Sequence, residues 1–141
     1  MAAIKPACIV LLLAVWTVVL FSSCYASEEL LGGWQEQNPN GDPTYLKLAH
    51  YAVSRQTKGK RMFDTVVKLR RVATQVVNGF KYMLIFAVAP SNCKIGRDYY
   101  SARRCRPTRQ PNKECQAIVY VGPTSGRKSV VRYNCRVAVR F

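Results

Sequence analysis

The sequence of 141 residues is poor in histidine and in acidic residues, with one His and seven Asp and Glu. One His is too few for the zinc sites that several imidazoles build, and it leaves a nucleophile only one imidazole base. That residue, His50, has no Cys or Asp partner in its sequence context. We therefore predict no catalytic residues, no metal site and no cofactor, and interpret His50 as a structural or surface residue.

Several other features are absent. The sequence has no Asn-x-Ser/Thr triplet, so N-glycosylation is not expected. It has no internal repeat, low-complexity tract or proline-rich linker, and this length favours one domain. A hydrophobic content of 49% is too high for a disordered chain, and eight Gly are too few for a collagen-like one. The composition is that of a globular protein.

The N-terminus carries the longest apolar run, residues 9–21, after a lone Lys5. This run is too short for a helix that spans a bilayer core of about 30 Å, which needs about 20 residues. Its length is typical of the hydrophobic region of a secretory signal peptide, and small residues follow it. We expect a signal peptide over residues 1–26, cleavage before Ser27, and one secreted domain over residues 27–141 with no membrane span. A retained anchor is disfavoured, because its span would extend into the acidic residues 28–29.

The loss of residues 1–26 leaves 115 residues, and the net charge falls from +15 to +14 because that segment holds one Lys and no acid. Two of the six cysteines leave with it. An even number of cysteines in a short secreted chain is typical of a disulfide framework, and no C-x-x-C spacing favours a metal site. The four that remain are Cys93, Cys105, Cys115 and Cys135.

One strong helix is predicted after a loose segment over residues 31–41. Asp42 suits the N-cap and Pro43 the first helical position, and Gly59 is expected to end the helix. Trp34 is expected to pack in the core at the start of a short first strand. The apolar residues of the helix form two adjacent ridges, Leu46, Ala49 and Val53 on one and Tyr45, Leu48 and Ala52 on the other.

The chain after Arg61 alternates in the manner of β-strands. The segment Gln75–Gly79 predicts a hairpin turn, because both residues of Asn-Gly tolerate positive φ. Pro90 is expected to end the return strand. On the first strand, Phe63, Thr65, Val67 and Leu69 share a face, and on the return strand Phe80, Tyr82, Leu84, Phe86 and Val88 do.

A second hairpin is predicted after a long polar loop over residues 91–114. Its strands cover residues 115–121 and 129–135, and its tip covers residues 122–126. With the hairpin centred on Ser125, residues 115 and 135 lie opposite each other, about 4.5 to 5.5 Å apart, which a disulfide can bridge. Among the three pairings that four cysteines allow, this geometry favours Cys115–Cys135 and leaves Cys93–Cys105.

The last strand alternates between two faces. We expect an outer basic face and an apolar face toward the helix. The outer set is Arg132, Asn134, Arg136, Ala138 and Arg140, and the inner set is Val131, Tyr133, Cys135, Val137, Val139 and Phe141. Together the elements predict an α+β fold, a cystatin-like antiparallel sheet of about five strands wrapped around one helix and held by two disulfides.

These motifs, in this order and spacing, resemble the secreted (type 2) cystatins, which inhibit papain-like cysteine proteases, and most closely the tick-type salivary cystatins. The resemblance covers nearly all of the mature chain and implies an inhibitor rather than an enzyme. The matching segments are Leu30-Leu31-Gly32-Gly33, the hairpin Gln75-Val76-Val77-Asn78-Gly79, and the four cysteines in order.

The resemblance implies three contacts with the active-site cleft of a cathepsin of the L, S, B or C type. Leu30 and Leu31 would fill the non-primed substrate pockets, while Gly32 and Gly33 let the backbone turn away before it is cut. The hairpin tip Gln75–Gly79 would form the central wedge. Gly122, Pro123 and Thr124 would make the third contact, although most relatives carry Pro-Trp in that tip. We expect a monomer, and the sequence leaves a dimer formed by hairpin swapping open.

The excess of basic residues is larger than solubility requires. Anionic glycosaminoglycans or cell surfaces are therefore expected as weak partners of a secreted chain. Nucleic acid is not expected, because no recognition motif is present. The alternative to an inhibitor is a cystatin-fold protein without inhibitory function, whose main work is cationic binding or host defence at such surfaces.

Overall fold

The computed structural model describes residues 33–138. The predicted signal peptide, Leu30, Leu31, Gly32 and the last three residues, 139–141, lie outside the described residues.

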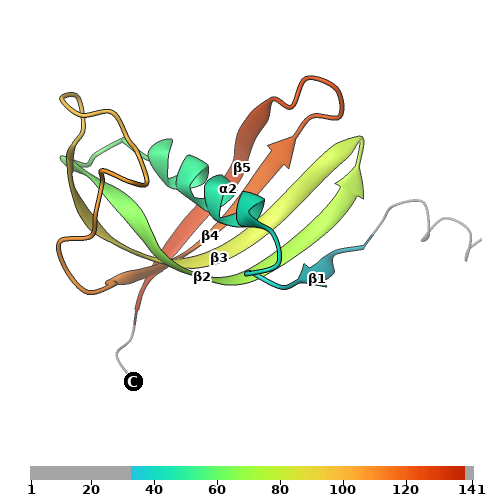
Figure 1. Cartoon of the computed structure of the whole chain (residues 1–141), viewed down its shortest axis with the longest axis horizontal. Coiled ribbons are helices and arrows are strands. Elements are labelled where there is room, and N and C mark those ends of the chain that lie inside the picture. The colour runs from blue at the N-terminus through green and yellow to red at the C-terminus, as the bar shows by residue number, and fades with distance from the viewer. Residues whose placement is uncertain (1–32, 139–141) are drawn as a thin grey trace, which may run out of the picture. The chain divides into compact units, whose positions relative to one another are not determined.

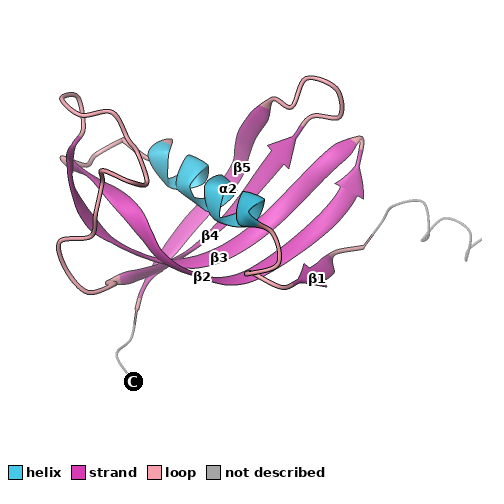
Figure 2. Cartoon of the chain, viewed as in Figure 1, coloured by secondary structure: helices cyan, strands magenta, loops and turns pink. Residues whose placement is uncertain are grey.

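The described chain forms a five-stranded antiparallel sheet in the order β1-β2-β3-β4-β5, and one helix lies across a face of this sheet (Figures 1 and 2). Each strand pairs with its neighbour in sequence, so short hairpins and the helix make all the connections except the long loop between β3 and β4. The predicted fold class is confirmed. The elements are β1 Gln35–Gln37, α2 Pro43–Ser54, β2 Met62–Val77, β3 Gly79–Lys94, β4 Lys113–Val121 and β5 Lys128–Val137.

The helix α2 begins as predicted, because the Asp42 side chain accepts a hydrogen bond of 2.8 Å from the Thr44 N–H and Pro43 occupies the first turn. The prediction that Gly59 ends it is wrong. The helix ends at Ser54, since the apolar periodicity stops at Val53 and polar residues follow. Gly59 lies in the next turn with φ 73°, where its conformational freedom is used.

The core lies between α2 and the sheet. Leu48, Ala49, Ala52 and Val53 of the helix are buried against the sheet, whereas Leu46, predicted on an apolar ridge, is 44% exposed. Leu46 lies on the outer side of the helix. The sheet contributes Val66, Val72, Leu84, Phe86, Val88, Cys115, Ala117 and Val119 to this cluster.

Two of the three irregularities in the pairing of β2 with β3 change the predicted alternation. The register shifts between Val66 and Lys68 and again between Leu69 and Arg71. An extra residue in one strand turns the following side chains to the other face. Val67, predicted on the same face as Phe63 and Thr65, is therefore 41% exposed.

Pro90 does not end β3, in contrast to the prediction, and the strand continues to Lys94. The Pro90 carbonyl accepts hydrogen bonds from the Thr108 N–H at 2.9 Å and from Thr108 Oγ1 at 3.1 Å. Because the nitrogen and carbonyl of a strand residue point to the same side, the Pro90 ring nitrogen faces this loop rather than β2. The pairing with β2 therefore needs no N–H from Pro90.

The predicted inner face of β5 is only partly correct. A register shift after Ile118 lets Val130 and Tyr133 pack against the core, while Val131 is 57% exposed. Val137 is 77% exposed near the end of this edge strand. Trp34, predicted to lie in the core, is 41% exposed.

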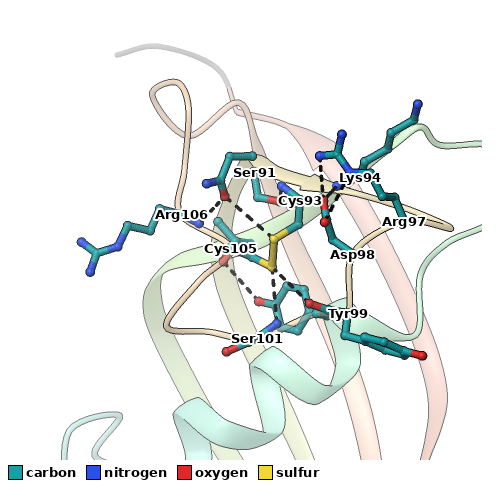
Figure 3. Close-up of a disulfide and its surroundings, with 12 residues drawn as sticks. Ser91, Cys93, Lys94, Arg97, Asp98, Tyr99, Ser101, Cys105 and Arg106 are labelled. Carbon is teal, nitrogen blue, oxygen red and sulfur yellow. Dashed lines mark hydrogen bonds and ion pairs between the residues drawn. A yellow bond between two sulfur atoms is a disulfide. The ribbon is translucent and has the colours of Figure 1, made fainter.

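Both predicted disulfides are formed. Cys115 and Cys135 pair directly across β4 and β5, with Cα atoms 4.0 Å apart. Cys93 and Cys105 close the loop after β3, with Cα atoms 5.2 Å apart (Figure 3). Both residues are buried, against Phe63.

The loop that carries Cys105 is also held by hydrogen bonds. The Lys94 N–H donates to the Asp98 carboxylate at 2.7 Å, and the Asn92 side chain accepts from the Arg106 N–H at 2.9 Å (Figure 3). Nearby, the buried Asp64 lies 2.6 Å from Lys60 Nζ and 3.2 Å from Lys113 Nζ. Covalent and polar contacts together fix this part of the molecule.

Candidate functional site

The register of the sheet brings three separate segments to one end of it. Gln35 pairs with Thr74, so the chain enters β1 beside the last residues of β2. Phe80 pairs with Val121, so the two hairpin tips adjoin. Figure 1 shows both tips and the start of β1 at the same end. We call Trp34 together with residues 75–80 and 121–127 the loop end.

The tip of the first hairpin is very tight. Val77 pairs with Gly79, which leaves Asn78 between the two strands. Gly79 has φ 105°. No described residue other than glycine has a positive φ, so Asn78 does not adopt the positive φ that Asn-Gly turns tolerate. A Cβ on Gly79 would lie 2.4 Å from the Val121 carbonyl oxygen, so no side chain fits at this position.

The first tip is also tied to β4. The Tyr120 hydroxyl donates a hydrogen bond to the carbonyl oxygen of Asn78. Together with the close approach of Gly79 to Val121, this contact fixes the first tip against the base of the second hairpin. The tip is therefore held in place from outside its own two strands.

The second tip is closed by its own backbone. The Gly122 N–H donates to the Arg127 carbonyl at 2.9 Å, and the Ser125 hydroxyl accepts from the Arg127 N–H at 3.3 Å. Gly126 has φ 62°, a conformation that favours glycine. Pro123 and Thr124 are exposed at the tip.

The loop end exposes apolar side chains. Val76 is 62% exposed, Phe80 45% and Trp34 41%. The reason is length, because a helix of 12 residues covers about 18 Å whereas a strand of 16 residues covers about 53 Å. The end of the sheet therefore extends past α2, so that the helix does not cover Val76 or Phe80, and the Phe80 ring lies beside that of Tyr82. Exposed apolar residues gathered at one place are typical of an interaction surface.

Two of these residues are not among the predicted contact residues. The sequence predicts Phe80 on one face of its strand with Tyr82 and Leu84, and Trp34 in the core. Phe80 does face the side of the sheet that carries α2, since it pairs with Val121 on the face that includes Tyr82. Its distance from the helix, which the sequence does not give, makes it a surface residue.

The predicted contact residues that the structure describes lie together. The hairpin Gln75, Val76, Val77, Asn78 and Gly79 forms the first tip, and Gly122, Pro123 and Thr124 belong to the second. Gly33 precedes β1 and is exposed, and a Cβ there would meet no atom within 4 Å. Its glycine is therefore not required by packing within the described chain. Leu30, Leu31 and Gly32 lie outside the described residues.

The loop end has no acid–base chemistry. Its segments contain Arg127 as their one charged residue. His50 lies elsewhere, with Nδ1 2.6 Å from the Tyr100 hydroxyl, and burial lowers the pKa of its imidazole. Within residues 33–138, no group of three or more His, Cys, Asp or Glu side chains could hold a metal ion. The arrangement suits binding rather than catalysis.

None of the helical segments within residues 33–138 is long and apolar enough to cross a membrane.

Comparison with known proteins gives consistent matches over most of the chain. Cystatin-2 of Ornithodoros moubata is 41% identical over 121 residues, which cover 83% of this chain and 94% of that protein. Mialostatin of Ixodes ricinus is 40% identical over 116 residues, which cover 81% of this chain and 82% of that protein. No family model matches the sequence.

Solved structures agree with these matches. The crystal structure of a salivary cystatin from the soft tick Ornithodoros moubata has a TM-score of 0.72 and 44% identity, and the match covers 74% of this chain and 97% of that one. The crystal structure of mialostatin, a gut cystatin from the hard tick Ixodes ricinus, has a TM-score of 0.73 and 38% identity, covering 76% and 100%.

Proposed function

The chain belongs to the cystatin family, and on this premise we propose that it is a reversible, tight-binding inhibitor of papain-like cysteine proteases of the cathepsin L, S, B or C type. It would act by occlusion, with the loop end seated in the active-site cleft. The observation that carries the proposal is the convergence of three segments at one end of the sheet.

The first tip is suited to be the central wedge. A wedge must enter a groove without presenting a peptide bond that the nucleophile can reach in a substrate-like conformation. Gln75–Gly79 is narrow, and both Tyr120 and Val121 restrain it. A segment that is ordered before binding avoids the entropy cost of becoming ordered during it, which favours tight association.

The N-terminal segment would supply the second contact. We propose that Leu30 and Leu31 occupy the non-primed substrate pockets, and that Gly32 and Gly33 turn the backbone away from the nucleophile. Support comes from the start of β1, where Gln35 pairs with Thr74, the residue just before the first tip begins at Gln75.

The second tip, Gly122-Pro123-Thr124, would make the third contact, on the primed side. It lacks the Trp that most relatives carry there, and a buried Trp is a frequent anchor of interfaces. Val76 and Phe80, which pair directly across the first hairpin, offer exposed apolar area close to this tip. We propose that they supply part of the apolar contact that the missing Trp would make.

We further propose that residues 1–26 are a signal peptide and that residues 27–141 are secreted as one monomeric domain. The support is the apolar run at residues 9–21 together with two disulfides, which form and persist in oxidising compartments.

The proposal is tested by inhibition assays on papain and on cathepsins L, S, B and C with the purified, disulfide-bonded protein. We expect nanomolar or tighter inhibition of at least one of these enzymes. A second protein, truncated to begin at Trp34, should inhibit at least about tenfold more weakly, because burial of one Leu side chain contributes about 1.5 to 3 kcal/mol. Full protease activity at micromolar concentrations of the intact protein would contradict the proposal.

A further inference from the structure

A second surface of the molecule is strongly charged and lies far from the loop end. It is a groove of about 1050 Å³ where the start of β4, the end of β5 and the loop before β4 meet. Four basic residues and one acid line it, namely Arg70, Arg109, Lys113, Arg136 and Glu114. Figure 1 shows the start of β4 and the end of β5 at the opposite end of the sheet from the hairpin tips. We call this feature the basic groove.

The alternation of side chains along β4 shows on which face of the sheet Glu114 lies. Cys115 is buried in the core under α2. Successive residues of a strand point to opposite faces, so Glu114 lies on the face away from the helix. It pairs with Arg136 across β4 and β5. Glu114 and Arg136 therefore lie on a face that the core does not use, whereas Lys113, two residues before Cys115, reaches the groove from the other face of β4.

Glu114 arranges the two arginines that flank it. Its carboxylate lies 2.5 Å from Arg136 Nη2 and 3.5 Å from Arg70 Nε. Glu114 is 23% exposed, whereas the arginine side chains are 53% and 81% exposed. Each guanidinium has five N–H donors, so most of the donors stay open to a ligand. One acid thus orients two cations without neutralising them.

The other two cations add to the positive charge. Lys113 Nζ lies 3.2 Å from Asp64, a carboxylate that Lys60 also contacts at 2.6 Å. Arg109 forms no ion pair within the described residues. The groove therefore keeps a net positive charge.

The wall of the groove is rigid. The Asn112 N–H donates to the Val88 carbonyl at 3.1 Å, and the Asn112 carbonyl accepts from the Ala138 N–H at 3.0 Å. These bonds hold the loop before β4 to both β3 and the end of β5. The loop backbone is therefore ordered before a ligand binds, which lowers the cost of binding.

We propose that the basic groove binds a sulfated polysaccharide. Guanidinium groups match the planar, bidentate geometry that sulfate and phosphate oxygens offer. The lining of the groove has no aromatic side chain, which disfavours insertion into a lipid surface. A linear polyanion fits this arrangement best. The choice of an extracellular polysaccharide rests on the proposed secretion of the chain.

The basic groove lies far enough from the loop end for both surfaces to be occupied at once. Glu114 and Val121 are seven positions apart along β4, which corresponds to about 23 Å at about 3.3 Å per residue. A polysaccharide in the groove therefore leaves the loop end free, so that the protein can be retained on a sulfated matrix while its loop end engages another protein.

The test is heparin affinity measured across a NaCl series. Arg70→Gln with Arg109→Gln and Arg136→Gln should weaken binding about tenfold or more at physiological salt, and should reduce the slope of log affinity against log salt by about three units. The matched control, Arg55→Gln with Lys58→Gln and Arg61→Gln, removes the same charge from exposed positions around the turn after α2 and should lose much less affinity. Equal losses in both variants would show a general charge effect and overturn the proposal.

Two further measurements keep the result unambiguous. Arg109→Gln alone breaks no ion pair and should reduce the salt slope by about one unit, even if the triple variant folds poorly. Binding to vesicles that contain phosphatidylserine, with no binding to heparin, would identify a membrane surface instead and overturn the proposal.

A last measurement addresses the free loop end. The groove variants should inhibit papain as well as the unchanged protein, and saturating heparin should not alter that inhibition. Competition between heparin and papain would contradict the separate position of the groove. The groove variants are expected to lose heparin binding and to keep inhibition of papain. Because the two assays are separate, failure of the proposed heparin binding can be distinguished from failure of the proposed inhibition.

Discussion

The two ends of the sheet are stabilised in different ways. At the far end, which we define as residues 60–64, 90–114 and 135–138, a disulfide and the Asp64 ion pairs hold the chain. The loop end contains no disulfide within the described residues. It is held by strand pairing, by the close approach of Gly79 to the Val121 carbonyl, and by the hydrogen bond from the Tyr120 hydroxyl. Removal of a disulfide or of charged residues at the far end should leave the structure of the two hairpin tips unchanged. The comparison teaches that stability and binding are largely separated along the strands.

Removal of the Cys93–Cys105 disulfide should have the largest effect on stability and little on binding. Cys93→Ser with Cys105→Ser opens a loop with a sequence separation of 12, which should lower the free energy of unfolding by about 3 kcal/mol. Inhibition of papain should stay within about twofold, because distant sites act independently. Chemical denaturation and an inhibition assay measure the two quantities. Inhibition lost in proportion to stability would show that the two ends are coupled.

A charge at the loop end should have the opposite effect. Val76→Asp should weaken inhibition by about 2 kcal/mol, or about thirtyfold, while stability changes by less than about 0.5 kcal/mol. Val131→Asp is the matched control, since Val131 is equally apolar and 57% exposed but lies on β5. Equal inhibition by the two variants would contradict the assignment of the loop end.

The tyrosine that restrains the first tip should contribute less. Tyr120→Phe removes the hydrogen bond to the Asn78 carbonyl and keeps the ring, so affinity for papain should fall by about 1 kcal/mol. Tyr99→Phe, at a 92% exposed position in the far end, should change nothing. If Tyr120→Phe inhibits fully, the tip does not need this restraint.

Acid should produce the smallest effect, at His50 of α2, whose imidazole contacts Tyr100 of the far end. Burial lowers the pKa of His50 in the folded protein below its value of about 6.5 in the unfolded chain, so protonation favours unfolding. The stability from neutral His50 is complete above about pH 6.5 and is lost as the pH falls through the folded pKa. The free energy of unfolding of His50→Gln should therefore fall less between pH 7 and pH 5 than that of the unchanged protein. Identical pH profiles would contradict this role.

Local rules predicted much of the fold. Asp42-Pro43 marked the helix start, the Asn-Gly pair marked the first hairpin, and the centre at Ser125 set the Cys115–Cys135 pair. Each depends on residues close in sequence or directly opposed in a hairpin. These interactions are what sequence patterns encode best.

The errors share a different cause. Val67 and Val131 are exposed because the register shifts within a strand pair, and Pro90 stays in its strand because a distant loop residue, Thr108, accommodates it. Phe80 is exposed because the sheet is longer than the helix that covers it, and Trp34 is exposed at the residue before β1, which begins at Gln35. Each outcome depends on tertiary packing that no local pattern contains.

The residues of the candidate site could be predicted from the sequence, but their assembly into one surface could not. The hairpin tips and Gly33 came from motifs, whereas their convergence needed the register of Gln35 with Thr74 and of Phe80 with Val121. The basic groove was visible only as excess charge, since Arg70, Arg109 and Arg136 lie far apart in the sequence.

Titration of a known amount of active papain with the purified protein tests the central claim most directly. The loop-end account predicts a linear loss of activity that ends at one inhibitor per enzyme, with the inhibitor recovered uncut. In the same titration, Gly79→Glu should leave papain largely active, because no side chain fits beside the Val121 carbonyl oxygen. Undiminished papain activity at excess protein, or a Gly79→Glu variant that inhibits as well as the unchanged chain, would contradict it.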